Sequence, residues 1–176
     1  HINVGFNTIL AEGRNIGVHF ARAPIVAFID DDAIAGPDYV ASVAEAFISL
    51  NIHGFRGKVL PKSNHPNNNK QNHYDLGALA IPRDIDTEGN SAFCVNTWRR
   101  FEGQDPLLFG LEGVELSYRM AKELGDYCLA YWPITTIRHD YSISNSKLES
   151  KTSRHMLMRE YLTFKHPDWR NYHSRL

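Results

Sequence analysis

The feature that most constrains this chain is an unbroken apolar run followed at once by three acidic residues. Residues Ile25–Ile29 are all apolar, and Asp30, Asp31 and Asp32 come directly after them. A continuous apolar run of this length predicts a strand buried on both faces of a parallel sheet, because a half-solvated strand would alternate polar and apolar residues. The sequence therefore places three carboxylates at the carboxyl end of a buried strand.

Strand and helix patterns alternate along the rest of the chain. We expect strands at residues 2–6 and 55–60 and helices opening at 14–20, after Pro37-Asp38, at 114–124 and at 146–164. The helix after Asp38 shows apolar residues at helical spacing (Val40, Val43, Ala44 and Phe47), and Gly125 is a stop signal for the helix at 114–124. Alternating strands and helices predict an α/β fold with a mostly parallel central sheet flanked by helices.

Composition argues against several classes of function. Nineteen Lys and Arg against 20 Asp and Glu give a net charge of −1, which argues against a nucleic-acid partner. The two cysteines, Cys94 and Cys128, form no C-x-x-C pair and indicate a reducing, cytoplasmic setting. No apolar run approaches the ~20 residues that span a bilayer. We expect one soluble globular domain whose charged chemistry is local.

The clustered carboxylates call for a counter-charge. Two carboxylates about 6 Å apart repel by roughly 3 kcal/mol at an effective dielectric of about 20, so three in succession favour a bound divalent cation. Ligands of open α/β sheets bind at the carboxyl ends of strands, where this cluster is expected. Oxygen ligands favour Mg²⁺ or Mn²⁺, and an imidazole would favour Mn²⁺. The alternative is that these aspartates cap the following loop or are simply solvated.

Four segments follow one another along the chain: residues 13–17, residues 28–32 with Pro37-Asp38, residues 88–93, and residues 109–119 followed by Pro133 and His139. In the same order they resemble the patterns A-R-N-x-G, F-L-D-x-D with P-D, G-x-N-x-A-F, and G-E-D-x-D-L-S-x-R followed by P and H. These patterns are those of the family 2 glycosyltransferases, which have the nucleotide-sugar-binding A-type fold (GT-A, Rossmann-like). One such segment is weak, whereas four in order are specific.

The resemblance implies a hexosyltransferase-type enzyme of polysaccharide biosynthesis that uses a nucleotide sugar, UDP-linked in the first instance, and Mn²⁺ or Mg²⁺. It assigns Asp32, Asp30 and His139 to the metal. The residues implied to contact the nucleotide, diphosphate or sugar are Arg14, Asn15, Asp30, Asp31, Gly89 and Asn90. Against metal binding, a single histidine near a strand end is more often hydrogen-bonded than ligating.

One departure from the family pattern concerns the general base. Where the family has Glu-Asp, with Asp as the base, this chain has Glu112-Gly113. Glu112 becomes the candidate base for an inverting transfer to an acceptor hydroxyl. The alternative is a first-turn glutamate that complements the helix dipole. Glu115 precedes Arg119 by four residues, the favourable order for an intrahelical ion pair, and is interpreted as structural.

A second departure is at the start of the sequence. The family's first strand, helix and strand find no counterpart, so we expect residues 1–176 to be a single catalytic domain that lacks its N-terminal part. From about residue 146 to 176 we expect a basic helical extension. Its default interpretation is a solvated face. A weaker one is peripheral contact with the inner face of a membrane that carries a lipid-linked glycan acceptor.

Two other functions stay open at this stage. A carbohydrate- or nucleotide-binding module that has lost catalysis would explain the missing Asp at position 113. An Asp-dependent phosphatase also has D-x-D after an apolar strand, but the residue two positions further on is usually Thr or Val, and here it is Ile34. Trp98 and Trp132 are either core residues or stacking platforms for a sugar ring.

Overall fold

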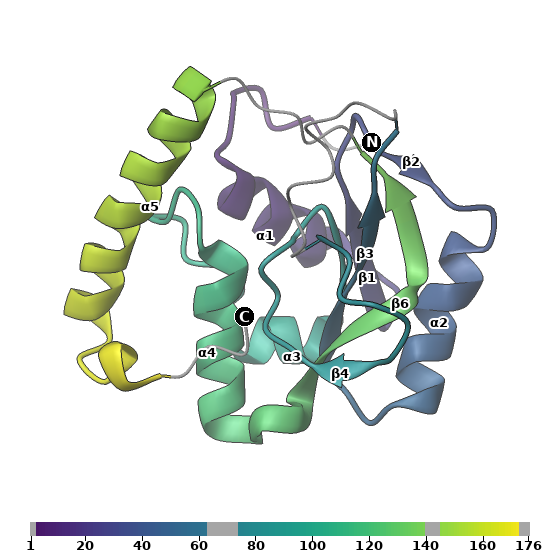
Figure 1. The fold of residues 1–176 in the computed structure, drawn as a ribbon. Coiled ribbons are helices and arrows are strands. Elements are labelled where there is room, and N and C mark those ends of the chain that lie inside the picture. Colours follow the sequence, from purple (N-terminus) through teal and green to yellow (C-terminus); the bar gives the residue numbers. More distant parts are fainter. Residues whose placement is uncertain (1–2, 63–73, 140–144, 173–176) are drawn as a thin grey trace.

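The computed structural model describes residues 3–62, 74–139 and 145–172, arranged as a central sheet with helices on both faces (Figure 1). The sequence also predicts a polar, asparagine-rich loop at residues 63–73, which lies outside the described residues. The elements are α1 (Leu10–Phe20), β1 (Ile25–Ile29), β2 (Ile34–Ala35), α2 (Tyr39–Ser49), β3 (Gly54–Leu60), β4 (Ile81–Pro82), β5 (Asn90–Cys94), α3 (Val95–Arg100), α4 (Glu112–Leu124), η3 (Asp126–Cys128), β6 (Leu129–Arg138), α5 (Asn145–Lys165) and η4 (Trp169–Asn171).

The sheet confirms the α/β class and corrects the predicted strand pairing. Its order is β1-β5-β3-β6-β2, with β4 also paired to β6. Among the described pairings only β3 with β6 is parallel. The strands β1, β3 and β6 do run in the same direction, but β5 lies between β1 and β3 and runs against both. The sheet is therefore mixed, because a short antiparallel strand separates two parallel ones.

The strand β1 is less buried than its apolar sequence predicts. Within the described part of the chain it pairs only with β5 and forms the edge of the sheet. Its Ala27 and Ile29 are exposed, while Ile25, Val26 and Phe28 are half-buried. The prediction of burial on both faces is wrong for this strand, because a sheet edge leaves backbone and side chains uncovered.

The core forms on both faces of the sheet because side chains alternate along each strand. On one face, Phe93 of β5 packs with Trp98 of α3 and Leu116 of α4, in a cluster that also includes α1. On the other face, Ala92 of β5 packs with residues of α2 such as Val43. Figure 1 shows the same layers, with α2 on one side of the sheet and α1, α3 and α4 on the other.

Helix positions agree with the sequence better than strand positions do. The predicted helices at 114–124 and 146–164 correspond to α4 and α5, and the strand predicted at 55–60 to β3. Residues 3–9 form no strand, so the predicted strand at 2–6 is wrong for its described part. In α2 the buried residues are Ser42, Val43 and Ala46, whereas Val40 is 80% exposed.

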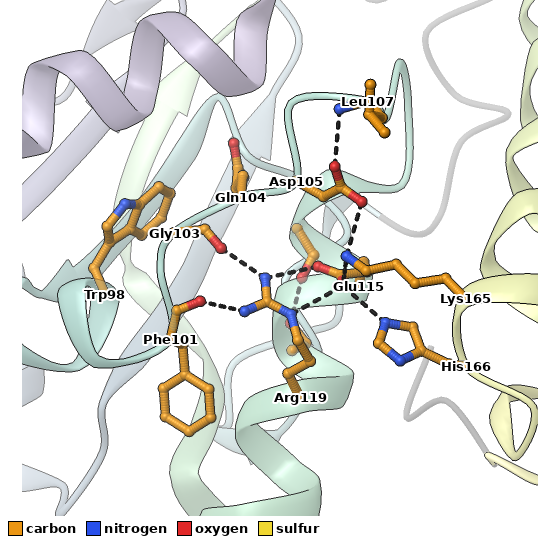
Figure 2. Close-up of polar contacts among 12 residues, drawn as sticks. Trp98, Phe101, Gly103, Gln104, Asp105, Leu107, Glu115, Arg119, Lys165 and His166 are labelled. Atoms are coloured by element: carbon orange, nitrogen blue, oxygen red, sulfur yellow. Dashed lines mark hydrogen bonds and ion pairs between the residues drawn. The ribbon is translucent and has the colours of Figure 1, made fainter.

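The helix α5 lies outside these layers and is fastened to α4 by one buried carboxylate (Figure 2). Glu115 of α4 is fully buried and accepts hydrogen bonds from Arg119, from Lys165 at 2.9 Å and from His166 at 2.9 Å. Lys165 also donates to Asp105 at 2.8 Å. The predicted Glu115–Arg119 ion pair is confirmed. Because the partners come from two helices and a loop, this network sets where α5 lies.

Candidate active site

A cavity of about 540 Å³ opens where the carboxyl ends of β1, β3 and β6 meet α4 and α5. Five residues that the sequence analysis singled out line it: Arg14, Asp30, Gly89, Glu112 and His139. They come from α1, the ends of β1 and β6, the turn before β5 and the start of α4. The strand-end location agrees with the rule that open α/β sheets bind ligands there.

Two aspartates and a histidine form a cluster, of which Asp30 and His139 line this cavity and Asp32 does not. One ligand atom each from Asp30, Asp32 and His139 lies within 4.8 Å of the others. His139 Nε2 is 2.9 Å from Asp32 Oδ1 and 3.7 Å from Asp30 Oδ2. Ligands held at about 2.1 Å in an octahedron are separated by roughly 3 Å when adjacent and roughly 4.2 Å when opposite. The spacing and the oxygen and nitrogen donors therefore fit a small divalent cation such as Mg²⁺ or Mn²⁺.

The position of Asp30 depends on the glycine that faces it. The Asp30 backbone N–H donates to Gly89 O at 3.2 Å, which joins the end of β1 to the turn before β5. A Cβ at position 89 would lie 2.0 Å from Asp30 Oδ2. Only glycine allows the carboxylate to stand this close, so Gly89 contributes to the site by leaving room for Asp30.

Two glutamates, Glu112, which is buried, and Glu88, which is partly buried, form the wall of the cavity nearest the start of α4. Glu112 is 4% exposed, lines the cavity and has no hydrogen-bond or ion-pair partner among the described residues. Glu88, which also lines the cavity, accepts hydrogen bonds from Arg14, from Gln104 Nε2 at 3.0 Å and from the Gly113 backbone N–H. The first carboxylate is unpaired, and the second is held by three donors.

Glu88 also explains the glycine at position 113. A Cβ there would lie 2.7 Å from Glu88 Oε1 and 2.4 Å from the Ile85 carbonyl oxygen. No side chain fits at 113, and the carboxylate of Glu88 takes the space next to the start of α4. Glu88 was not among the predicted site residues, because the pattern of residues 88–93 draws attention to Gly89 and Asn90. An acidic residue directly before Gly89 was the signal available.

Burial and charge raise the pKa of Glu88 to about 6. Desolvation is the main cause, Arg14 opposes it, and the carboxylate of Glu112 adds to it. A buried carboxyl with a pKa near neutral is suited to proton transfer at physiological pH.

Three of the residues predicted to contact the nucleotide sugar do not line this cavity. Asn15 instead fixes a loop: its Nδ2 donates to Gln104 O at 2.7 Å, and its Oδ1 accepts from Gln104 N and from Trp98 Nε1. Asn90 is fully buried, and its Nδ2 donates to Lys58 O at 2.8 Å and to Thr135 O at 3.0 Å. Asp31 is exposed beside the cluster. The two asparagines hold neighbouring segments because their amides satisfy buried backbone groups.

The two tryptophans belong to the core. Trp98 is 3% exposed and packs on Phe28 and Phe93, and Trp132 is 7% exposed with its indole N–H donating to Ser42 O. The interpretation of either tryptophan as a stacking platform for a sugar is therefore wrong for the described structure.

The fold, with its site at the strand ends, is the GT-A fold of its structural neighbours. More narrowly, the chain belongs to glycosyl transferase family 2, because the sequence model of that family matches residues 1–105. No curated protein matches the sequence significantly.

Solved structures share the fold at low sequence identity. GalNAc-T7, crystallised with UDP, GalNAc and Mn²⁺, has a TM-score of 0.59 at 15% identity over 81% of this chain and 32% of its own. Glucosyl-3-phosphoglycerate synthase from Mycobacterium tuberculosis, in complex with phosphoglyceric acid, has a TM-score of 0.59 at 15% identity over 91% of this chain and 56% of its own. A mycobacterial protein has a TM-score of 0.53 at 17% identity over 83% of this chain and 48% of its own. The chain thus spans between a third and a little over half of these structures.

None of the helices in the described residues is both long and apolar enough to cross a membrane.

Proposed function

We propose that this chain transfers a sugar from a nucleotide sugar, a UDP-sugar in the first instance, to an acceptor hydroxyl, with a divalent metal and with inversion at the anomeric carbon. The observation that carries the proposal is the Asp30, Asp32 and His139 cluster, two of whose members line the same cavity as the unpaired Glu112. The GalNAc-T7 structure, which has the same fold, contains UDP and Mn²⁺.

Asp30, Asp32 and His139 would hold the metal. When bound, a divalent cation neutralises the charge that develops on a departing nucleoside diphosphate. Among the residues predicted for the donor, Arg14 and Gly89 line the same cavity as Asp30 and remain in the proposal. Arg14 is ion-paired with Glu88, so its charge is already partly neutralised before any phosphate binds.

The proton of the acceptor hydroxyl passes to a carboxylate in the cavity wall. We propose Glu112 as that base, because it is buried and no described residue donates to its carboxylate. Glu88 stands beside it as the second member of the pair and is held by Arg14, Gln104 and the Gly113 N–H. Glu88 ionises as pH rises through about 6, so a step in activity at that pH that is absent in Glu88→Gln would belong to Glu88 and not to the base.

The test of the reaction is hydrolysis of UDP-glucose, UDP-GlcNAc and related donors with Mn²⁺, followed with and without EDTA. We expect slow release of UDP by the wild type and loss of release in Asp32→Ala and in EDTA. The control is Asp38→Ala, which removes an exposed aspartate at the start of α2, outside the metal cluster and the cavity lining. If no donor is hydrolysed or bound with Mn²⁺, the proposed transfer is wrong.

A second candidate function is a carbohydrate- or nucleotide-binding module without turnover. It is favoured by Gly113, because that position leaves no room for a catalytic side chain. Binding of a nucleotide sugar with no hydrolysis and no transfer to any acceptor would support the module. A generic phosphate ester tests the phosphatase alternative in the same assay.

The acceptor is proposed to be a carbohydrate or a lipid-linked glycan. On α5, Met156, Leu157 and Phe164 are 63%, 60% and 86% exposed. Exposed apolar residues on a basic helix suit peripheral contact with an anionic membrane. Co-sedimentation with vesicles of phosphatidylglycerol and phosphatidylcholine at low salt tests this part, and absence of binding contradicts the membrane contact alone.

A further inference from the structure

The helix α5 contributes a positively charged face to the cavity. Lys151, His155 and Arg159 line it, together with Glu112 and His139 from the body of the domain. The three residues are spaced by four positions, and in a helix residues four apart lie on the same side. The sequence analysis treated this helix as a solvated basic surface. In the structure, the side of the helix that carries Lys151, His155 and Arg159 instead faces the candidate active site.

These three side chains have no hydrogen-bond or ion-pair partner within residues 3–62, 74–139 and 145–172. Other cations of the same helix are engaged: Arg154 stacks on Phe109 with its Cζ 4.5 Å from the ring centroid, and Lys165 binds Asp105 and Glu115. The cavity is therefore lined by Lys151 and Arg159, the unpartnered Lys and Arg side chains among those described on α5, with His155 between them. Their crowding is also apparent in His155, whose pKa is lowered by burial and by Lys151, Arg154 and Arg159.

The charged face is fixed in place at two levels. His155 packs on Gly110, where a Cβ would lie 2.9 Å from its Cδ2, and the Phe109 N–H donates to Met158 Sδ at 3.3 Å. At the far end of the helix, Lys165 is anchored on Glu115 (Figure 2). A face that is preorganised in this way binds a ligand without first having to be ordered.

We propose that Lys151, His155 and Arg159 form an oxyanion-binding face that holds a phosphate or carboxylate group of a substrate. Ammonium and guanidinium groups bind such oxyanions through charge-assisted hydrogen bonds. The anionic group is either the diphosphate of the donor or a charge carried by the acceptor. That assignment to a substrate rests on the proposed function, whereas the oxyanion-binding face itself is testable without turnover.

The first experiment measures binding of inorganic pyrophosphate and of inorganic phosphate by titration calorimetry, in EDTA so that no metal contributes. We expect the wild type to bind pyrophosphate and the double variant Lys151→Ala/Arg159→Ala to bind at least about tenfold more weakly, since each charge-assisted hydrogen bond contributes this much or more. Arg100→Gln is the matched control, because it removes one positive charge at an exposed ion pair with Glu123 that lies outside the cavity lining. Circular dichroism verifies that each variant is folded.

The second experiment separates the two sources of the anion. The wild type is first saturated with UDP and Mn²⁺, and phosphate is then titrated in. If UDP excludes phosphate and the double variant binds UDP at least about tenfold more weakly, the face serves the donor. If phosphate still binds and UDP affinity is unchanged in the variant, the face serves an anionic acceptor.

Two results would overturn the proposal: no pyrophosphate binding by the wild type, or equal binding by the wild type and the folded double variant. Failure of the proposed function is a separate result. In that case nucleotide sugars are neither bound nor hydrolysed with Mn²⁺, while pyrophosphate binding in EDTA and its loss in the double variant persist.

Discussion

Glu112 and Glu115 lie three residues apart on α4, and both are buried, yet their surroundings differ completely. Glu115 is fully buried and is met by Arg119, Lys165 and His166. Glu112 is 4% exposed, lines the cavity, and receives no hydrogen bond from the described residues. One helix thus carries a carboxylate with several hydrogen-bond donors on the side that faces α5 and Asp105, and a carboxylate without a described donor at the cavity.

Burial does not distinguish these two glutamates, whereas the number of their partners does. A buried charge without partners is costly, and its cost is recovered when a ligand or proton arrives. Burial alone would raise the pKa of Glu115, but the hydrogen bonds from Arg119, His166 and Lys165 outweigh it and hold that pKa below its usual value. At Glu88, beside Glu112, burial prevails and the pKa is raised.

The largest expected effect is on activity and comes from Glu112→Gln. Removal of a general base lowers turnover by about 10²- to 10⁴-fold, and the shape of the glutamine preserves the fold. Initial rates with whichever UDP-sugar the hydrolysis assay identifies as a donor measure the loss, and a thermal melt within a few degrees of the wild type shows that folding is intact. Unchanged turnover would mean that Glu112 is not the base, and Glu88→Gln is then the variant to assay.

Glu115→Gln is expected to act on stability instead. Removing the carboxylate leaves Lys165, His166 and Arg119 without their common partner, and loss of one member of a buried charge network costs about 3 kcal/mol. Urea unfolding followed by tryptophan fluorescence measures the change. An equally large loss of stability in Glu112→Gln would abolish the distinction between the two glutamates.

The pH dependence of unfolding sharpens the same contrast. The folded pKa of Glu115 lies below its usual 4.5, so the folded state keeps the ionised form to lower pH than the unfolded state does. Its stabilisation is therefore present above pH 4.5 and is lost as pH falls through the folded pKa. We expect the stability difference between the wild type and Glu115→Gln to be constant above the usual pKa of 4.5 and to shrink as pH falls through the lower pKa of the folded state. A difference that grows on acidification would contradict this sign.

The smallest effect is expected at an exposed ion pair. Arg100 and Glu123 are paired with side chains 59% and 52% exposed, and such pairs contribute about 0.5 kcal/mol or less. Arg100→Gln should leave both turnover and the urea midpoint within error of the wild type. A larger loss would show that partner number at the surface also matters, which the comparison of the two glutamates does not predict.

Local patterns predicted the parts of this molecule that local chemistry determines. The end of helix α4 was predicted from Gly125. The cluster of Asp30, Asp32 and His139 was predicted through the resemblance of residues 28–32 and His139 to the family pattern. Strand pairing could not be predicted in the same way. Nothing in the sequence of β5 states that it inserts between β1 and β3, and this insertion makes the sheet mixed. The roles of Asn15 and Asn90 also depend on distant backbone groups.

At position 113 the close approach of a neighbouring backbone segment restricts which residue can be present. The segment from Ile85 to Glu88 lies so close that a Cβ at 113 meets both a side-chain carboxylate and a backbone carbonyl. A side chain could shorten in one substitution, but the carbonyl moves only if the whole segment shifts. Gly113→Asp, which would reproduce the family pattern, therefore requires the backbone of the 85–88 segment to move. An aspartate could be introduced at this position only together with changes in that segment.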